Sequence, residues 1–206
     1  MESALRQGAG SPGLKLIETL RADSGPARLA LHRARMAKGA VALGWGFDAD
    51  GFDRALACDP AQGQRLRLTL DALGHFALTQ TTLAVTIAPW RLALSQEKLT
   101  SNDPWLTLKS TNRAGYDAAR AALPDGIDEV ILCNERGEVC DGSITTLFFD
   151  RGSGLRTPPL ISGVLPGILR REMACPEEPL LAKDLPQVRL WVGNALRGLI
   201  PAIWHC

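Results

Sequence analysis

The sequence predicts a mixed α+β protein that is built from two halves. Segments in which apolar and polar residues alternate predict strands, and segments with apolar residues three or four positions apart predict helices. Pro89 and the polar stretch 95–103 mark the boundary between the halves. A chain of 206 residues is long enough for one large domain or two small ones.

The first half contains both kinds of periodicity. Alternation predicts strands at residues 14–21, 65–70, 76–79 and 83–88. Helical spacing predicts helices at residues 29–43 and 47–56. The Gly25-Pro26 pair ends the first strand in a turn, and Gly74 joins the second strand to the third in a hairpin.

The second half has a similar mixture of elements. Short apolar runs predict strands at residues 129–133, 138–140, 145–149 and 189–192. A short helix is predicted at residues 116–123, where the Pro124-Asp125-Gly126 sequence ends it. Another helix is predicted at residues 167–173.

Composition and charge exclude several classes of protein. A hydrophobic content of 46% with 22% charged residues is typical of a soluble globular protein. A net charge of +1, with scattered Lys and Arg, argues against a nucleic-acid partner. No apolar run approaches the roughly 20 residues of a membrane span, and without a signal-peptide core at the N-terminus we expect a cytoplasmic protein. The five cysteines and three separated histidines predict reduced thiols and no metal site.

Several chemically useful residues follow one another in a definite order. Lys109 ends an apolar stretch, Asp141 lies some thirty residues later, and a hydroxyl cluster at Thr145 and Thr146 follows it. A helix that starts at Gly167 then offers backbone N–H groups to an anion. A pyridoxal phosphate site needs these parts: an amine for covalent attachment, a carboxylate for the pyridinium nitrogen, and donors for the phosphate.

This ordered set resembles the class IV aminotransferases, which are pyridoxal phosphate enzymes of fold type IV. The resemblance extends over residues 16–202. Within the family it is most similar to the 4-amino-4-deoxychorismate lyases. The Lys-x-x-Asn-Arg motif at 109–113 and the Asn-Ala-Leu motif at 194–196 are lyase-like, because the transaminase branches tend to differ at both places.

The resemblance implies a D-amino acid aminotransferase-like α+β fold. A small α/β domain would comprise residues 1–92, and a larger β-rich domain, residues 93–206, would carry the lysine. The cofactor would lie between the domains and near the interface of a homodimer. Family members usually begin with a strand hairpin, which the stretch 8–15 does not provide, so we expect a shortened small domain.

The resemblance also assigns roles to individual residues. Lys109 would form the Schiff base with the cofactor, and Asp141 would pair with its ring nitrogen, although the family usually has Glu there. Arg35 matches the phosphate-binding arginine of a His-x-x-Arg pattern. Further phosphate contacts would come from Thr145, Thr146, Gly167 and Ile168.

Three residues are candidates for the substrate side. Thr19 matches a threonine that is implicated in proton handling, Arg197 would pair with a substrate carboxylate, and Asn194 would make a polar contact. Each candidate also has an ordinary structural explanation, such as a strand threonine, a solvent-facing arginine or, for Asp141, a turn residue.

The resemblance implies a lyase that eliminates pyruvate from aminodeoxychorismate to give p-aminobenzoate, a step of folate biosynthesis. One alternative is a transaminase of the same fold that acts on D-amino or branched-chain amino acids. A second alternative is a cofactor-free or inactive homologue that kept the fold as a dimerising module.

Overall fold

The computed structural model describes residues 2–57 and 63–205. They form two compact units: Met1–Val85 with Leu108–Asn112, and Thr86–Thr107 with Arg113–Cys206. These units differ from the predicted division at residue 92 in two ways. The first unit ends at Val85, and the segment that contains Lys109 returns to it because Ile17 N–H donates to the Lys109 carbonyl at 2.8 Å.

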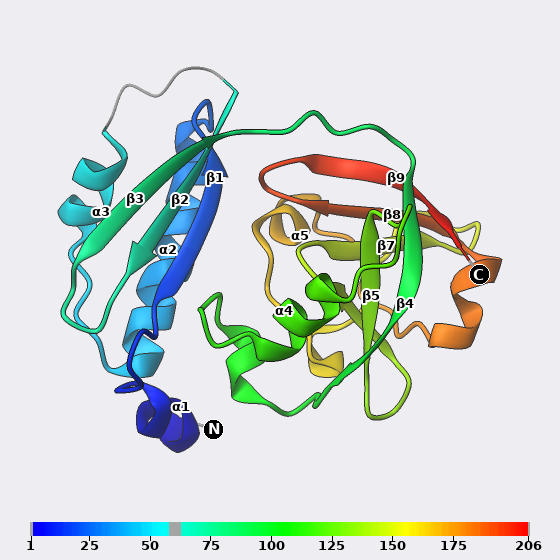
Figure 1. Ribbon diagram of the computed structural model, residues 1–206, viewed down its shortest axis with the longest axis horizontal. Helices are drawn as coiled ribbons and strands as arrows, with labels where there is room; N and C mark the ends of the chain where they lie inside the picture. Colours follow the sequence, from blue (N-terminus) through cyan, green and yellow to red (C-terminus); the bar gives the residue numbers. More distant parts are fainter. Residues whose placement is uncertain (1, 58–62, 206) are drawn as a thin grey trace. The chain divides into compact units, whose positions relative to one another are not determined.

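The first unit is an antiparallel sheet covered by helices (Figure 1). Its elements, in chain order, are α1 (Glu2–Gly8), β1 (Leu16–Arg21), α2 (Pro26–Leu43), α3 (Ala49–Leu56), β2 (Gln64–Leu70) and β3 (Phe76–Thr82). The strand order is β1-β2-β3. Pro26 begins α2 with a preset φ, and Gly44 ends it in the left-handed conformation.

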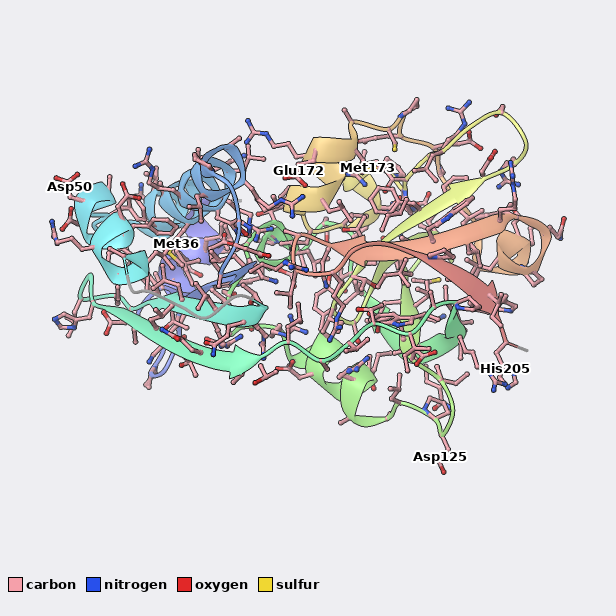
Figure 2. The ribbon with its side chains drawn as sticks, turned by 90° about the horizontal axis from the view of Figure 1, so that it is seen from above. Met36, Asp50, Asp125, Glu172, Met173 and His205 are labelled. Atoms are coloured by element: carbon pink, nitrogen blue, oxygen red, sulfur yellow. The ribbon has the colours of Figure 1, made fainter. Side chains whose placement is uncertain are left out.

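One face of this sheet is the buried one. Apolar side chains alternate along the strands on this face; they are Leu16, Leu20, Leu66, Leu68 and Leu70. The buried apolar residues of the helices are Met36, Ala40 and Leu43 of α2 and Phe52 of α3. Met36, labelled in Figure 2, belongs to α2 and is 2% exposed. A Cβ on Gly39 would lie 3.0 Å from the end of the Leu16 side chain, so α2 approaches β1 closely there and a larger residue would have to displace Leu16 slightly.

The second unit is a closed six-stranded barrel, β4-β5-β6-β7-β8-β9. Its strands are β4 (Trp90–Leu99), β5 (Glu129–Asn134), β6 (Val139–Gly142), β7 (Thr146–Asp150), β8 (Arg189–Asn194) and β9 (Gly198–Trp204). Its helices are α4 (Ala114–Ala121) and α5 (Ile168–Met173), with short 3-10 turns at Pro104–Thr107, Leu160–Ser162 and Ala182–Gln187. Strand β4 closes the barrel by pairing in parallel with both β5 and β9.

Apolar side chains from all around the barrel fill its core. The buried cluster consists of Trp90, Leu92, Ile131, Cys133, Val139, Leu147, Phe149, Leu180, Leu185, Leu190, Val192 and Ile200. A second cluster, against α4, contains Leu99, Leu106, Ala119, Ile127, Val130, Leu132, Cys140 and Val164. Every residue of β5 is buried, which explains why its sequence is a continuous apolar run rather than an alternation.

One predicted strand is wrong and others were not predicted. Residues 83–88 form no strand: Val85 and Ile87 are more than four-fifths exposed, and among the described residues the segment belongs to neither sheet. The strand of this region is β4, which overlaps the stretch that suggested a boundary. Local sequence did not reveal it, because its partners β5 and β9 lie far along the chain. Helix α1 and strand β9 were also not predicted.

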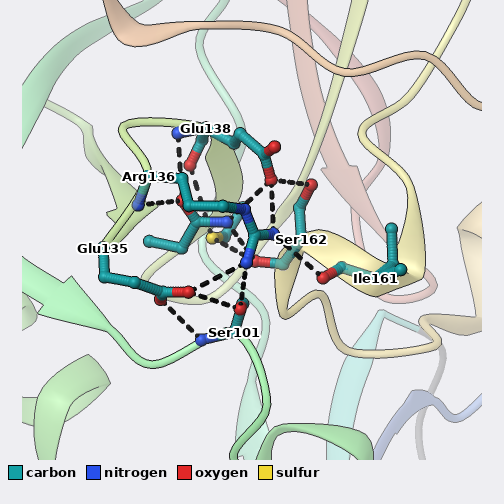
Figure 3. A network of polar contacts seen from close by, with 8 residues as sticks. Ser101, Glu135, Arg136, Glu138, Ile161 and Ser162 are labelled. Atoms are coloured by element: carbon teal, nitrogen blue, oxygen red, sulfur yellow. Dashed lines mark hydrogen bonds and ion pairs between the residues drawn. The ribbon is translucent and has the colours of Figure 1, made fainter.

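A polar network fastens the turn between β5 and β6 to two other loops (Figure 3). Arg136 donates to Ser101 Oγ at 2.5 Å, to Glu135 at 2.9 Å and to Glu138 at 2.7 Å. Glu138 also accepts from Ser162 Oγ at 2.8 Å. Hydrogen bonds from Arg136 lower the pKa of Glu138 to about 2, so the network is fully charged near neutral pH.

Two general predictions concern the thiols and membranes. Cys133, Cys140 and Cys175 are free thiols, whereas Cys58 and Cys206 lie outside the described residues. Burial raises the pKa of the Cys133 thiol to about 11, which keeps it protonated and unreactive. Within 2–57 and 63–205, no helix has the length and apolar character needed to cross a membrane.

Candidate functional site

The predicted lysine lies at the edge of the sheet in the first unit. An isolated antiparallel bridge joins Ser110 to Leu16, so these two side chains lie on the same face, the face that packs against α2. Neighbouring residues alternate, and Lys109 therefore lies on the opposite face with Ile17 and Thr19. The two residues predicted to handle protons, Lys109 and Thr19, share this face, and both are half-buried.

Arg35 lies on the helix-covered face and is tied to a buried carboxylate. Its Nε donates to Glu18 Oε1 at 2.8 Å and its Nη2 to Oε2 at 2.5 Å, a two-point guanidinium–carboxylate pair. His32 Nδ1 lies 2.6 Å from the same Oε2 and must carry a proton, since a carboxylate only accepts. Burial alone would raise the pKa of Glu18, but Arg35 and His32 outweigh it and lower this pKa. Arg35 is therefore oriented by Glu18.

In the second unit, the predicted cofactor residues converge at the junction of β6 and β7. Asp141 and Thr146 face one another across this strand pair. Asp141 is 3% exposed, and its Oδ2 accepts from the Leu165 N–H at 2.7 Å. A Cβ on Gly167 would lie 3.0 Å from Thr146 Oγ1, so the start of α5 abuts the Thr146 hydroxyl. Residues widely separated in the sequence thus form one cluster.

The remaining phosphate candidates are engaged within the protein. Thr145 donates its hydroxyl to Glu129 Oε2 at 2.9 Å, and the Gly167 N–H donates to the Leu165 carbonyl at 2.8 Å. Ile168 is the first residue of α5, a helix of 6 residues. Thr146 and Ile168 are therefore better placed to offer donors to an anion than Thr145 and Gly167.

Two of the three substrate-side candidates lie where β8 meets β9: Asn194 ends β8, and Arg197 lies in the turn that follows. Asn194 Oδ1 accepts from the N–H groups of Leu196 and Arg197, and its Nδ2 donates to the Ile144 carbonyl at 3.1 Å. The Arg197 guanidinium lies 5.7 Å from the centre of the Trp90 ring and donates to Thr86 Oγ1 at 2.9 Å. Asn194 thus has a structural use, and Arg197 is held over an aromatic surface.

Two buried glutamates beside the candidate residues, Glu129 and Glu18, were not predicted from the sequence. Glu129 begins an apolar run, the usual place of a solvated strand end, yet it is 0% exposed. Glu18 occupies the apolar phase of β1, between Leu16 and Leu20, and this misplaced charge was the signal that could have revealed it. Arg113, which the sequence singled out only as the last residue of the Lys-x-x-Asn-Arg motif, donates to the Ser143 carbonyl at 2.8 Å.

The chain belongs to the class IV aminotransferases, because the Amino-transferase class IV family matches residues 15–203. A "Putative aminodeoxychorismate lyase" of Schizosaccharomyces pombe is 28% identical over 166 residues, which are 77% of this chain and 72% of that protein. A "Probable branched-chain-amino-acid aminotransferase" of Thermotoga maritima is 41% identical over 66 residues, 32% of this chain. The chain spans only 24% of the length of that relative.

Solved structures agree with this assignment. A "Putative amino-acid aminotransferase" from Mesorhizobium loti is 36% identical with a TM-score of 0.86, over 93% of this chain and 100% of that one. A "Putative 4-amino-4-deoxychorismate lyase" from Legionella pneumophila is 21% identical with a TM-score of 0.80, over 92% and 82% of the two chains, and shows the fold alone. The protein is an enzyme of a family that is known to use pyridoxal phosphate, and the predicted fold class is confirmed.

Proposed function

We propose that the protein is a pyridoxal phosphate-dependent 4-amino-4-deoxychorismate lyase that releases pyruvate and forms p-aminobenzoate. The observation that carries the proposal is that both lyase-like motifs hold one loop. Arg113 of the first motif donates to the Ser143 carbonyl, and Asn194 of the second motif donates to the Ile144 carbonyl. Both carbonyls belong to the loop that follows Asp141. The match to the S. pombe protein supports it, since this match covers 77% of the chain.

The residues fit the cofactor that the family uses. A buried carboxylate such as Asp141 suits a protonated ring nitrogen, which needs an anionic partner. Thr146, Ile168 and Arg35 would serve the phosphate, and Lys109 would attach the cofactor. When bound, the cofactor supplies an electron sink for the carbon that loses its proton.

The side chains of this protein would move the protons. The Lys109 amine would take the proton from the substrate carbon as a general base. Thr19, on the same face of the sheet, or Lys109 itself would protonate the departing enolpyruvyl group, which leaves as pyruvate. Arg197 would pair with a substrate carboxylate, and its position over Trp90 holds the charge in place.

The direct test is incubation with enzymatically generated aminodeoxychorismate. We expect p-aminobenzoate and pyruvate in equal amounts, and neither product from Lys109→Ala. Formation of a keto acid from D-amino or branched-chain amino acids, without p-aminobenzoate, would contradict the lyase assignment. Sedimentation or gel filtration should show the homodimer that we propose for a cytoplasmic enzyme of this family.

A transaminase is the second candidate, because the M. loti protein is 36% identical and is covered over 100% of its length. The two reactions would differ after proton removal: a transaminase would release a keto acid, whereas the lyase would release pyruvate by elimination. A cofactor-free homologue is the third candidate. Colour separates it from the other two, because a holoenzyme is yellow and its absorbance is bleached by borohydride.

A further inference from the structure

Gly142, the last residue of β6, and the turn 143–145 that leads to β7 separate Asp141 from Thr146, and we call these four residues loop 142–145. These two residues are register partners, so the path of the loop sets the spacing and orientation of the pair. What holds the loop therefore also determines where a ring-nitrogen partner and a phosphate donor lie.

A buried carboxylate holds the inner side of this loop, beside the Val130 carbonyl, which also accepts from Ser143 N–H at 3.2 Å. Glu129, the first residue of β5, is 0% exposed. Its Oε1 accepts from Ser143 N–H at 3.0 Å and from the Ser143 hydroxyl, while Oε2 accepts from Ile144 N–H at 3.1 Å and from the Thr145 hydroxyl at 2.9 Å. Four donors on three consecutive residues thus converge on one side chain.

The outer side of the loop is held as well. Arg113 donates to the Ser143 carbonyl, Asn194 donates to the Ile144 carbonyl, and Gly142 N–H donates to the Thr145 carbonyl at 2.8 Å. With the Glu129 contacts, these bonds engage the N–H groups of residues 142–144 and the carbonyls of residues 143–145. A loop bonded in this way has few alternative conformations.

The space around Gly142 shows how closely the Glu129 carboxylate approaches the loop. A Cβ at this position would lie 2.8 Å from Glu129 Oε2 and 2.3 Å from Thr145 Oγ1. Both distances are shorter than contacts that a real Cβ makes, so the turn and the carboxylate fit only around glycine.

We propose that Glu129 is a positioning residue of the cofactor site, which acts by holding loop 142–145 so that Asp141 and Thr146 are correctly placed before the cofactor binds. The proposal rests on the proposed function, since it assigns the same site a further residue. A carboxylate suits this set of neighbours, because both of its oxygens accept and the N–H groups of Ser143 and Ile144 can only donate. Arg120, 3.6 Å away, contributes a compensating charge.

Glu129→Gln is the decisive variant. Glutamine has the same shape, but its NH₂ group would replace one of the two oxygens and could not accept from the backbone N–H that donates to that oxygen. We expect amide hydrogen exchange across 142–146 of the cofactor-free protein to accelerate at least tenfold. We also expect the Kd for pyridoxal phosphate, from an absorbance titration, to rise at least tenfold.

Glu138→Gln is the matched control. Glu138 is also a network glutamate of the second unit, and its bonds to Arg136 and Ser162 do not reach the loop. The Glu138→Gln protein should therefore have the same Kd for pyridoxal phosphate, and the same amide exchange rates at 142–146, as the parent. If Glu129→Gln does not fold, Ser143→Ala and Thr145→Val each remove one donor from the same carboxylate and should give smaller increases in both measurements.

The outcomes separate the two proposals. Parent-like exchange in Glu129→Gln would overturn the role of Glu129, and so would faster exchange with an unchanged Kd, because the loop would then not govern the site. If the parent protein itself binds no pyridoxal phosphate, while Glu129→Gln still accelerates exchange of the loop, the proposed function would be refuted. The link between the loop and a cofactor would fall with it.

Discussion

Replacing Glu18 with glutamine should destabilise the protein far more than replacing Asp23 with asparagine. Both carboxylates accept from the Nε and Nη2 of one arginine: Arg35 at 2.8 and 2.5 Å, and Arg21 at 2.8 and 2.7 Å. The pairs differ in burial, because Glu18 and Arg35 are 1% and 14% exposed while Asp23 and Arg21 are both 39% exposed. Glu18→Gln and Asp23→Asn are chemically equivalent substitutions, so the difference between their effects on stability measures the effect of burial.

The magnitude follows from the charge that remains. Removing one partner of a buried ion pair costs about 3–5 kcal/mol, because the other charge stays buried without compensation. The residual exposure of Arg35 places Glu18→Gln near the lower end, at about 3 kcal/mol. At about 2–4 °C per kcal/mol, Tm should fall by roughly 6–12 °C. The exposed Asp23→Asn control should melt like the parent.

The pH dependence supplies a second, independent readout. The folded-state pKa of Glu18 lies below its ordinary value of 4.5, so its contribution to stability is present above that value and is lost as the pH falls through the folded pKa. The difference in Tm between parent and Glu18→Gln, followed by circular dichroism from about pH 7 to about pH 3, should shrink on acidification. A Glu18→Gln protein that melts with the parent at neutral pH would refute the reasoning.

Other predictions concern attachment, the ring partner and packing. Borohydride reduction and peptide mapping should find the pyridoxyl group on Lys109, and Lys109→Ala should be colourless while Lys98→Ala stays yellow; a label on Lys98 would contradict the assignment. Asp141→Asn should lower turnover by orders of magnitude, since an amide cannot pair with a protonated ring nitrogen as an anion does; parent-like turnover would leave Asp141 as a turn residue. Gly193→Ala should cost at least about 1–3 kcal/mol in denaturant unfolding, because its Cβ would lie 2.4 Å from the Gly198 carbonyl. Gly10→Ala, with no atom within 4 Å, is the control for that variant, and equal midpoints would refute the packing argument.

Local periodicity was sufficient to predict most of the strands and helices, but it could not predict barrel closure. Strand β1 and helix α2 have patterns that report their own buried faces. Strand β4 does not, because much of it faces solvent and its partners lie some thirty and more than a hundred residues away. The segment 83–88 suggested a strand by its alternation, yet among the described residues it joins neither sheet, and Val85 and Ile87 are exposed.

The candidate site shows a similar limit. Sequence order predicted Asp141 and Thr146 as cofactor residues, and the fold places them opposite one another. It could not identify Glu129, because a glutamate at the start of an apolar run has the same appearance whether it is solvated or buried. Only the convergence of Ser143, Ile144 and Thr145 on its two oxygens distinguishes these cases.

The aspartate at position 141, where the family usually has Glu, acquires a physical explanation from these contacts. Asp141 Oδ2 accepts from Leu165 N–H at 2.7 Å, so the segment that leads into α5 lies directly against the shorter side chain. A longer carboxylate would have to displace that segment, at a cost of about 1–3 kcal/mol for overpacking. A short side chain also has less freedom to adjust its reach, so its usefulness depends on a backbone held in one place. The loop bonded to Glu129 meets that requirement, and the departure at 141 and the buried glutamate are therefore two parts of one arrangement.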